Sequence, residues 1–218
     1  CKYAVGKLRF VVGENQAELA YEGWAHLLAE GRQKPPPFKC PESALESYHL
    51  AATDDGLVTA AEAIAACAAS GTRGLAVHMG ASAASGQLAL PESLVRCPVS
   101  AEQVLETELV TCSMCGQSLA PSALRGNRCR ACRRLAAVSK DDPRMARALG
   151  VYPGLDHWRR WKIAETERAY ILLAVGLLRQ LLIVLDKETL DVLRAAEGQR
   201  LLGSWQELPQ VEQQELLG

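Results

Sequence analysis

Four cysteines near the middle of the chain stand at a spacing that is typical of a metal site. They form two C-x-x-C pairs, and thirteen residues separate Cys115 from Cys129. Each pair can wrap a tight turn around one side of an ion, so two pairs complete a tetrahedron. Zinc suits four thiolates because it is borderline-soft and has no redox chemistry of its own. The spacing therefore predicts a Zn²⁺ site whose ligands are Cys112, Cys115, Cys129 and Cys132.

A site with four protein ligands leaves no position for a substrate, which indicates a structural metal. Residues 109–135 resemble the zinc ribbon family, in which two C-x-x-C knuckles are joined by a linker of hairpin length. The resemblance implies a small β-rich module that commonly contacts nucleic acids or proteins, and it does not identify an enzyme. A redox role for Cys112 and Cys115 is disfavoured, because it would leave the second pair without a purpose.

Cysteine and serine residues recur at a fixed interval ahead of this site. Counting back from Cys112 in steps of fifteen reaches Cys97, Ser82 and Cys67, and a related segment begins at Cys40. A fixed period indicates stacked supersecondary units. We predict a run of degenerate zinc-ribbon-like hairpins in which serines bond the turn backbone where a second thiolate would stand. The alternative is chance alignment in a stretch rich in Ala, Ser and Gly.

Patterns of apolar residues divide the chain into three predicted domains. Residues 1–39 read as a strand at 3–12 and a helix at 16–30, ahead of a rigid run of three prolines. Residues 40–138 form the hairpin array that ends in the zinc ribbon. Within it, Asp55-Gly56 indicates a hairpin turn, and 60–66 could be a short helix. The predicted fold class is thus α+β and β-rich, with tandem hairpins flanked by small α/β elements.

Residues 139–218 form the third predicted domain, an α+β module. Asp141 or Asp142 caps a helix that starts at Pro143, and a second short helix covers 155–162. Residues 164–185 could form one buried helix, or strands at 168–175 and 181–185 that continue into 190–195; the turn-like segment 186–189 favours strands. A further strand is expected at 199–207, and the tail from 209 frays or forms a short helix.

The predicted zinc ribbon is locally basic although the chain carries a formal net charge of −1. Rigidly held arginines suit phosphate oxygens, because their guanidinium groups form paired hydrogen bonds. The alternative is ion pairing with the acidic Glu102, Glu106 and Glu108, and the absence of interleaved aromatics disfavours base stacking. The candidate phosphate-binding residues are Arg125, Arg128, Arg130, Arg133, Arg134 and Lys140.

Two further clusters of polar residues could do chemistry. Cys40, Cys67 and Cys97 with His49 could form a second metal site, but no ligand spacing supports it, and ordinary buried cysteines are favoured. The C-terminal acids could form a metal-dependent nuclease site, but any charged domain of this size offers such a set. These acids are Asp156, Glu165, Glu167, Asp186 and Glu188.

Bulk properties set the remaining expectations. A chain of 218 residues that begins with Cys1 reads as a piece of a longer cytoplasmic protein, with no membrane span. We expect a non-catalytic zinc-binding accessory module that contacts DNA or RNA backbone through the basic zinc ribbon. The alternatives are a protein-interaction scaffold built on the hairpins, which would bind a partner or other domains of the parent chain, and the nuclease.

Overall fold

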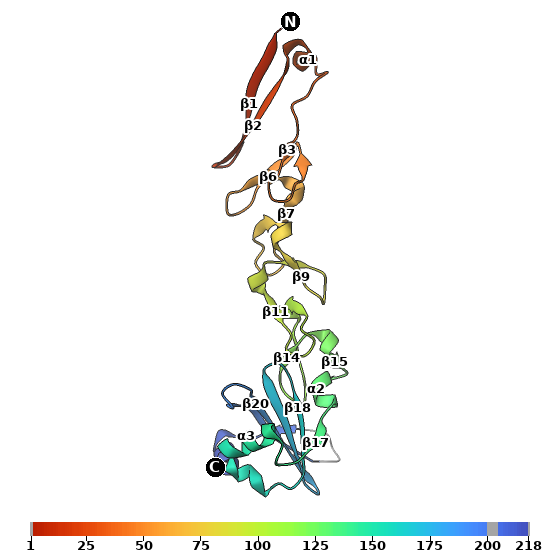
Figure 1. Cartoon of the computed structure of the whole chain (residues 1–218), viewed down its shortest axis with the longest axis vertical. Helices are drawn as coiled ribbons and strands as arrows, with labels where there is room; N and C mark the ends of the chain where they lie inside the picture. The colour runs from red at the N-terminus through yellow and green to blue at the C-terminus, as the bar shows by residue number, and fades with distance from the viewer. Residues whose placement is uncertain (1, 200–204, 218) are drawn as a thin grey trace. The chain divides into compact units, whose positions relative to one another are not determined.

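The computed structural model describes residues 2–199 and 205–217. Contacts within the chain divide it into two compact units, Cys1–Val95 and Arg96–Gly218. Many two-stranded hairpins and a few short helices make up the chain, so the predicted β-rich α+β class is confirmed (Figure 1).

The first unit opens with a long antiparallel ribbon. Strand β1 (Tyr3–Val12) pairs along its whole length with β2 (Asn15–Trp24), and the short helix α1 (Ala25–Ala29) follows. The strand predicted at 3–12 is confirmed, whereas the helix predicted at 16–30 is wrong over most of its length. The apolar residues of 16–24 suit a strand as well as a helix, and a two-residue turn after Val12 brings them back along β1.

Short hairpins make up the rest of the first unit. The strand pairs are β3 (Phe38–Lys39) with β4 (Glu46–Ser47), β5 (Leu50–Ala52) with β6 (Val58–Ala60), β7 (Ile64–Ala66) with β8 (Arg73–Leu75), and β9 (Gly80–Ala81) with β10 (Leu88–Ala89). Single 3-10 turns, η1 (Ala61–Ala63), η2 (Ala76–His78) and η3 (Pro91–Ser93), join several of them. The Asp55-Gly56 turn is confirmed. The helix considered at 60–66 is only η1, after which β7 begins.

The turns of these hairpins share one hydrogen-bond arrangement. At Cys67 the backbone N–H donates to the carbonyl five residues on, and the N–H of Gly71 donates back to the Cys67 carbonyl. The same two bonds occur in the turns that begin at Cys40, Ser82, Cys97 and Cys112. Ser70 and Ser85 each accept a 3.3 Å hydrogen bond from the N–H two residues on, which confirms that serines bond the turn backbone.

The second unit combines further hairpins with one six-stranded sheet. Strand β11 (Leu94–Arg96), which spans the boundary, pairs with β12 (Gln103–Leu105); β13 (Val110–Thr111) pairs with β14 (Ser118–Leu119), and β15 (Leu124–Arg125) with β16 (Arg128–Cys129). The turns η4 (Glu106–Glu108) and η5 (Pro121–Ala123) intervene, and helix α2 (Arg130–Arg133) follows β16. The sheet contains β17 (Ala136–Val138), β18 (Trp161–Glu165), β19 (Ala169–Val175), β20 (Arg179–Asp186), β21 (Val192–Gln199) and β22 (Trp205–Glu207), antiparallel and in chain order.

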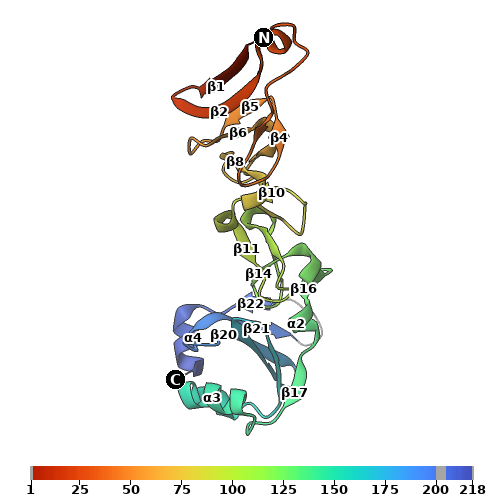
Figure 2. The same ribbon diagram turned by 45° about the horizontal axis from the view of Figure 1, so that its top comes forward.

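Different elements lie on the two sides of this sheet, with α3 (Pro143–Val151) and α4 (Gln210–Leu217) on one side and α2 on the other (Figure 2). One face packs Ile171, Leu173 and Leu182 against the four clustered cysteines and Met114. The opposite face packs against α3, the 3-10 turn η6 (Pro153–His157) and α4. The segment that holds the four cysteines therefore shares a core with one face of the sheet, while the helices share a core with the other face.

The strands favoured for the apolar C-terminal stretch are confirmed by β19, β20 and β21. Asp142 caps α3 as expected, since its carboxylate accepts a 3.0 Å hydrogen bond from the Arg144 N–H. The helix expected at 155–162 is wrong, because η6 ends at His157 and Trp161 already belongs to β18. Of the strand expected at 199–207, β22 is seen, while 200–204 lie outside the described residues; the tail forms α4.

Candidate metal centre and basic surface

The four predicted ligands come from two local structures. Cys112 and Cys115 lie in the turn between β13 and β14, whereas Cys129 ends β16 and Cys132 lies in α2. The second pair therefore sits where a strand enters a helix, not in a second hairpin turn. All four side chains are buried, with exposed fractions between 0% and 5%. Their sulfur atoms all lie within 4.8 Å of one another.

The distances between these sulfur atoms fit a tetrahedral ion. The Sγ atoms of Cys112 and Cys132 are 3.8 Å apart, and those of Cys115 and Cys129 are 3.9 Å apart. A tetrahedron with metal–sulfur bonds of about 2.3 Å has edges of about 3.8 Å. These two separations match the edge of such a tetrahedron, and all four sulfur atoms lie within 4.8 Å of one another, so the cluster could hold a metal ion.

Backbone N–H groups support the sulfur atoms. The N–H of Cys129 donates to Cys112 Sγ, and the N–H of Cys132 donates to Cys129 Sγ, each at 3.3 Å. Such bonds orient the ligands and stabilise negative charge on sulfur. They also join the two pairs, because the first bond runs from one pair to the other.

The protonation of the cluster indicates why a cation belongs there. Hydrogen bonds from the other three thiols hold the pKa of Cys112 far below its usual range. The pKa values of Cys115 and Cys132 are raised, chiefly because these thiols donate to the Cys112 sulfur. The pKa of Cys129 is lowered to about 7, so the raised pKa values of Cys115 and Cys132 are what oppose four thiolates in the absence of a bound cation.

Arg194, which sequence reasoning missed, fastens the first cysteine pair to the sheet. Its Nη1 donates to the carbonyl oxygens of Ser113 at 3.1 Å and Met114 at 2.6 Å. Its Nε and Nη2 contact a carboxylate oxygen of Glu207 at 2.8 and 2.6 Å. The side chain is only 16% exposed, and it packs 3.1 Å from the position that a Cβ on Gly116 would take.

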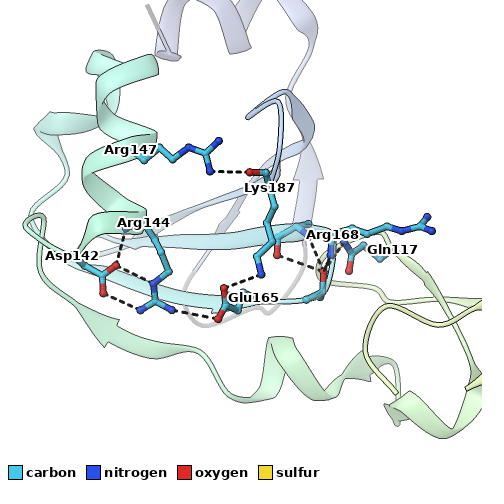
Figure 3. Close-up of polar contacts among 9 residues, drawn as sticks. Gln117, Asp142, Arg144, Arg147, Glu165, Arg168 and Lys187 are labelled. Carbon is cyan, nitrogen blue, oxygen red and sulfur yellow. Dashed lines mark hydrogen bonds and ion pairs between the residues drawn. The ribbon is translucent and has the colours of Figure 1, made fainter. Parts of the chain in front are cut away.

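A second contact fastens the same turn to the sheet at Thr166. Gln117 Nε2 donates to Thr166 Oγ1 at 3.4 Å, and that hydroxyl also accepts from the N–H groups of Arg168 and Ala169 at 3.3 and 3.0 Å (Figure 3). The Cys112–Cys115 turn is therefore held at two points, by Arg194 on β21 and by Thr166 between β18 and β19.

Five of the six predicted phosphate-binding residues are exposed around this centre. Arg125 and Arg128 face each other across the β15–β16 hairpin, and Arg130, Arg133 and Arg134 lie in α2 or directly after it. Within 2–199 and 205–217, none of these five forms an ion pair, so the pairing considered with Glu102 and Glu106 is not found. Glu108 accepts a 3.1 Å hydrogen bond from the N–H of Leu105.

Lys140 differs from these five arginines because its ammonium group already pairs with Asp156. Its Nζ contacts the carboxylate of Asp156 at 2.5 Å, and it also donates to the Asp156 carbonyl. The exposed basic surface is therefore Arg125, Arg128, Arg130, Arg133 and Arg134, which we call the arginine surface.

The second metal site considered for Cys40, Cys67, Cys97 and His49 is not formed. Throughout the described part of the chain, metal-type groups of three or more are found only at the four clustered cysteines. Cys40 and Cys97 instead accept backbone hydrogen bonds from Ser43 and Ser100 in their own turns. His49 lies 3.9 Å from a carboxylate oxygen of Glu62. These three cysteines have turn roles, which explains their spacing.

The C-terminal acids considered for a nuclease do not gather into a metal site among the described residues. Glu165 contacts Lys187 at 3.0 Å and Arg144 at 3.9 Å, and Arg144 in turn forms two 2.9 Å bonds to Asp142 (Figure 3). Glu167 pairs with Arg96 at 3.5 Å. Asp186 caps its own turn by accepting from the N–H groups of Glu188 and Thr189. Glu165, Glu167 and Asp186 therefore each have a local structural role.

Comparisons with protein families, with curated proteins and with solved structures find no match for this chain. Every helix within 2–199 and 205–217 is too short or too polar to cross a membrane.

Proposed function

We propose that the cluster binds one structural Zn²⁺ and that the arginine surface around it contacts the phosphate backbone of a nucleic acid. Four buried thiolates favour zinc over harder cations such as magnesium or calcium, which prefer oxygen ligands. Iron bound by four thiolates would share this geometry, so the metal content has to be measured. With all four positions filled by protein, the ion would hold the surface rigid without contacting a substrate.

The observation that carries this proposal is the lack of acidic partners for the arginines. Exposed arginines in folded proteins often pair with neighbouring carboxylates, as Arg144 does with Asp142. The arginine surface makes no such pair among the described residues, and its hairpin and helix are tied together through Cys129 and Cys132. Guanidinium groups without an ion pair can bind phosphate with no existing pair to break, and a fixed backbone beneath them keeps their Cα positions in one arrangement.

Charge reversal tests the proposal. The triple variant Arg128→Glu, Arg130→Glu and Arg133→Glu is compared with the unchanged protein by fluorescence anisotropy, using labelled single- and double-stranded DNA and RNA. We expect at least a roughly tenfold loss of affinity, because three phosphate contacts become repulsive. Metal content and circular dichroism are measured on the same samples.

A matched control changes the same charge elsewhere. Lys7, Arg32 and Lys39 are exposed cations of the first unit, with side chains 72%, 71% and 64% exposed. Their reversal to Glu should leave nucleic-acid affinity nearly unchanged. Equal losses in both triple variants would show that only net charge matters, and this would overturn the assignment to the arginine surface.

A protein-interaction scaffold is the second candidate function, and the β1–β2 ribbon favours it. Val5 and Val11 on this ribbon are 77% and 65% exposed, and a two-stranded ribbon is marginally stable alone. A protein partner that covers these apolar side chains would bind in a salt-tolerant way. Replacing both valines by Thr would weaken such binding and would leave nucleic-acid affinity unchanged.

A further inference from the structure

A polar cavity lies between the cysteine module and the six-stranded sheet. Its volume is about 320 Å³, within the range of about 300–1,000 Å³ that is usual for small-molecule sites. The described residues that line it are Met114, Arg128, Cys132, Arg133, Leu135, Lys162, Leu173, Gln180, Gln199 and Trp205. They come from both the metal module and the sheet, so the cavity depends on the two being joined.

The charge of this cavity is one-sided. Arg128, Arg133 and Lys162 line it, and no acid is found among its described lining residues. None of these three cations forms an ion pair within the part of the chain that the structure describes. Three cations that line one cavity without acidic partners give it a positive potential, which favours an anionic ligand.

Strand pairing explains why there is space beside Trp205. Gln180 on β20 pairs with Gly198 on β21, and Gly198 pairs with Trp205 on β22. Side chains in such a cross-strand row share one face of the sheet. Because the middle residue is glycine, the Gln180 amide and the Trp205 indole stand on either side of a place where no side chain fills the row.

The indole nitrogen of Trp205 is an unpaired hydrogen-bond donor within the described part of the chain. This Nε1 atom is buried and makes no hydrogen bond among the described residues. A buried indole N–H usually has a partner, since an unsatisfied donor costs about 1–3 kcal/mol. The cavity therefore combines cations for a phosphate, an aromatic surface for a base, and amides that can donate and accept at a base edge.

We propose that this cavity binds one unstacked nucleotide, with its phosphate at Arg128, Arg133 and Lys162 and its base beside Trp205. This inference rests on the proposed function and adds to it a preference for single strands, because a paired base cannot leave its stack without cost. The same chemistry could come from a free nucleoside monophosphate or from a nucleotide within a strand.

Binding of a labelled single-stranded oligonucleotide and of its duplex tests this inference. We expect the zinc-loaded chain to bind the single strand more tightly, and Trp205→Ala to weaken single-strand binding about tenfold with little effect on the duplex. Trp205→Phe should keep most of the affinity, because the ring can still stack. Trp24→Ala is the control, since Trp24 lies in the first unit and is 45% exposed.

A competition experiment and a second variant complete the test. Competition by a free nucleoside monophosphate would show that the cavity takes free nucleotides, and its absence would assign the cavity to strands. Lys162→Gln changes an exposed strand position and provides a second variant if Trp205→Ala lowers stability. It should also lower the affinity for the single strand and leave the affinity for the duplex unchanged.

Equal affinity for single strand and duplex, unchanged in the Trp205 and Lys162 variants, would overturn the proposal that the cavity binds a nucleotide. Phosphate contact by the arginine surface would still be supported. Binding of neither form at low salt would overturn both proposals.

Discussion

The guanidinium of Arg194 donates a 2.6 Å hydrogen bond to the carbonyl oxygen of Met114, which lies between the two cysteines of the first pair. Eighty positions separate the two residues in the sequence. The bond fixes the Cys112–Cys115 turn to strand β21 and couples the metal centre to the large sheet. The arginine surface is thus connected to the sheet through the cysteine cluster.

Arg194→Ala should destabilise the second unit. It removes the exposed hydrogen bond to Ser113, the part-buried one to Met114 and the contact with Glu207, so we expect a loss of roughly 2–3 kcal/mol in the free energy of unfolding. Urea unfolding of the zinc-loaded chain, followed by circular dichroism, measures this. Arg179→Ala is the matched control. Arg179 lies on the same sheet, its side chain is 76% exposed, and its ion pair with Glu197 is long, at 3.9 Å. A similar loss in both variants would contradict the role of Arg194.

Gly116→Ala should lower the affinity of the cluster for metal. Gly116 has a φ of +72°, and its new Cβ would lie 3.1 Å from Arg194 Cδ. Gly71 has a φ of +75° in the equivalent turn but no atom within 4 Å of its Cβ position. Competition with a chromophoric chelator should therefore show weaker metal binding for Gly116→Ala and unchanged binding for Gly71→Ala. If the two variants hold metal equally well, the contact with Arg194 has no part in the site.

The chain should hold one metal ion, and Cys129→Ser should remove it. Losing one of four thiolates leaves an incomplete tetrahedron around a closed structural site. Elemental analysis of purified protein by plasma mass spectrometry gives the number and identity of bound ions. Cys67→Ser changes a buried cysteine outside the cluster and should leave one ion bound. Two metal ions bound to the unchanged chain, or loss of metal from the Cys67→Ser variant, would indicate that a second metal site exists.

The metal should remain bound at neutral pH and dissociate as the pH falls. The pKa of Cys112 is held low by hydrogen bonds from its neighbouring thiols, and that of Cys129 is about 7. A thiol whose pKa is lowered binds the ion as thiolate above that pKa and loses it below, and the bound cation lowers the pKa values further. A dye that reports released metal should show that the metal is lost as the pH falls. The pH dependence of this release should be steeper than one proton per ion. Release that does not depend on pH would exclude thiolate ligation.

The clustering of the four cysteines could be predicted from the sequence because its geometry is local. The members of each C-x-x-C pair are three residues apart, and the β15–β16 hairpin leads from the first pair back to the second. The strands β19 and β20 were also predicted, since a turn-like segment interrupts the apolar stretch. The segment 16–24 was assigned wrongly because Tyr21, Trp24 and Leu28 fit helical spacing, whereas Leu19 and Tyr21 fit strand alternation; pairing with β1 decides in favour of the strand.

Long-range contacts explain what the sequence could not show. Trp205 and Lys162 reach the arginine surface only because four strand pairings, from β18 to β22, bring them onto one sheet. The sequence therefore offered a basic patch without aromatic residues, whereas the fold places an indole beside two of its arginines. Arg194 gave no local signal, because a single arginine within an alternating strand usually faces solvent.

The salt dependence of binding to a labelled single-stranded oligonucleotide tests the central claim most directly. The logarithm of the association constant should fall linearly with the logarithm of salt concentration, with a slope of roughly −2.8 to −3.5 if four or five arginines contact phosphates. Arg130→Gln should reduce that slope by about 0.7. No binding at the lowest salt concentration, or a slope near zero, would contradict phosphate contact by the arginine surface.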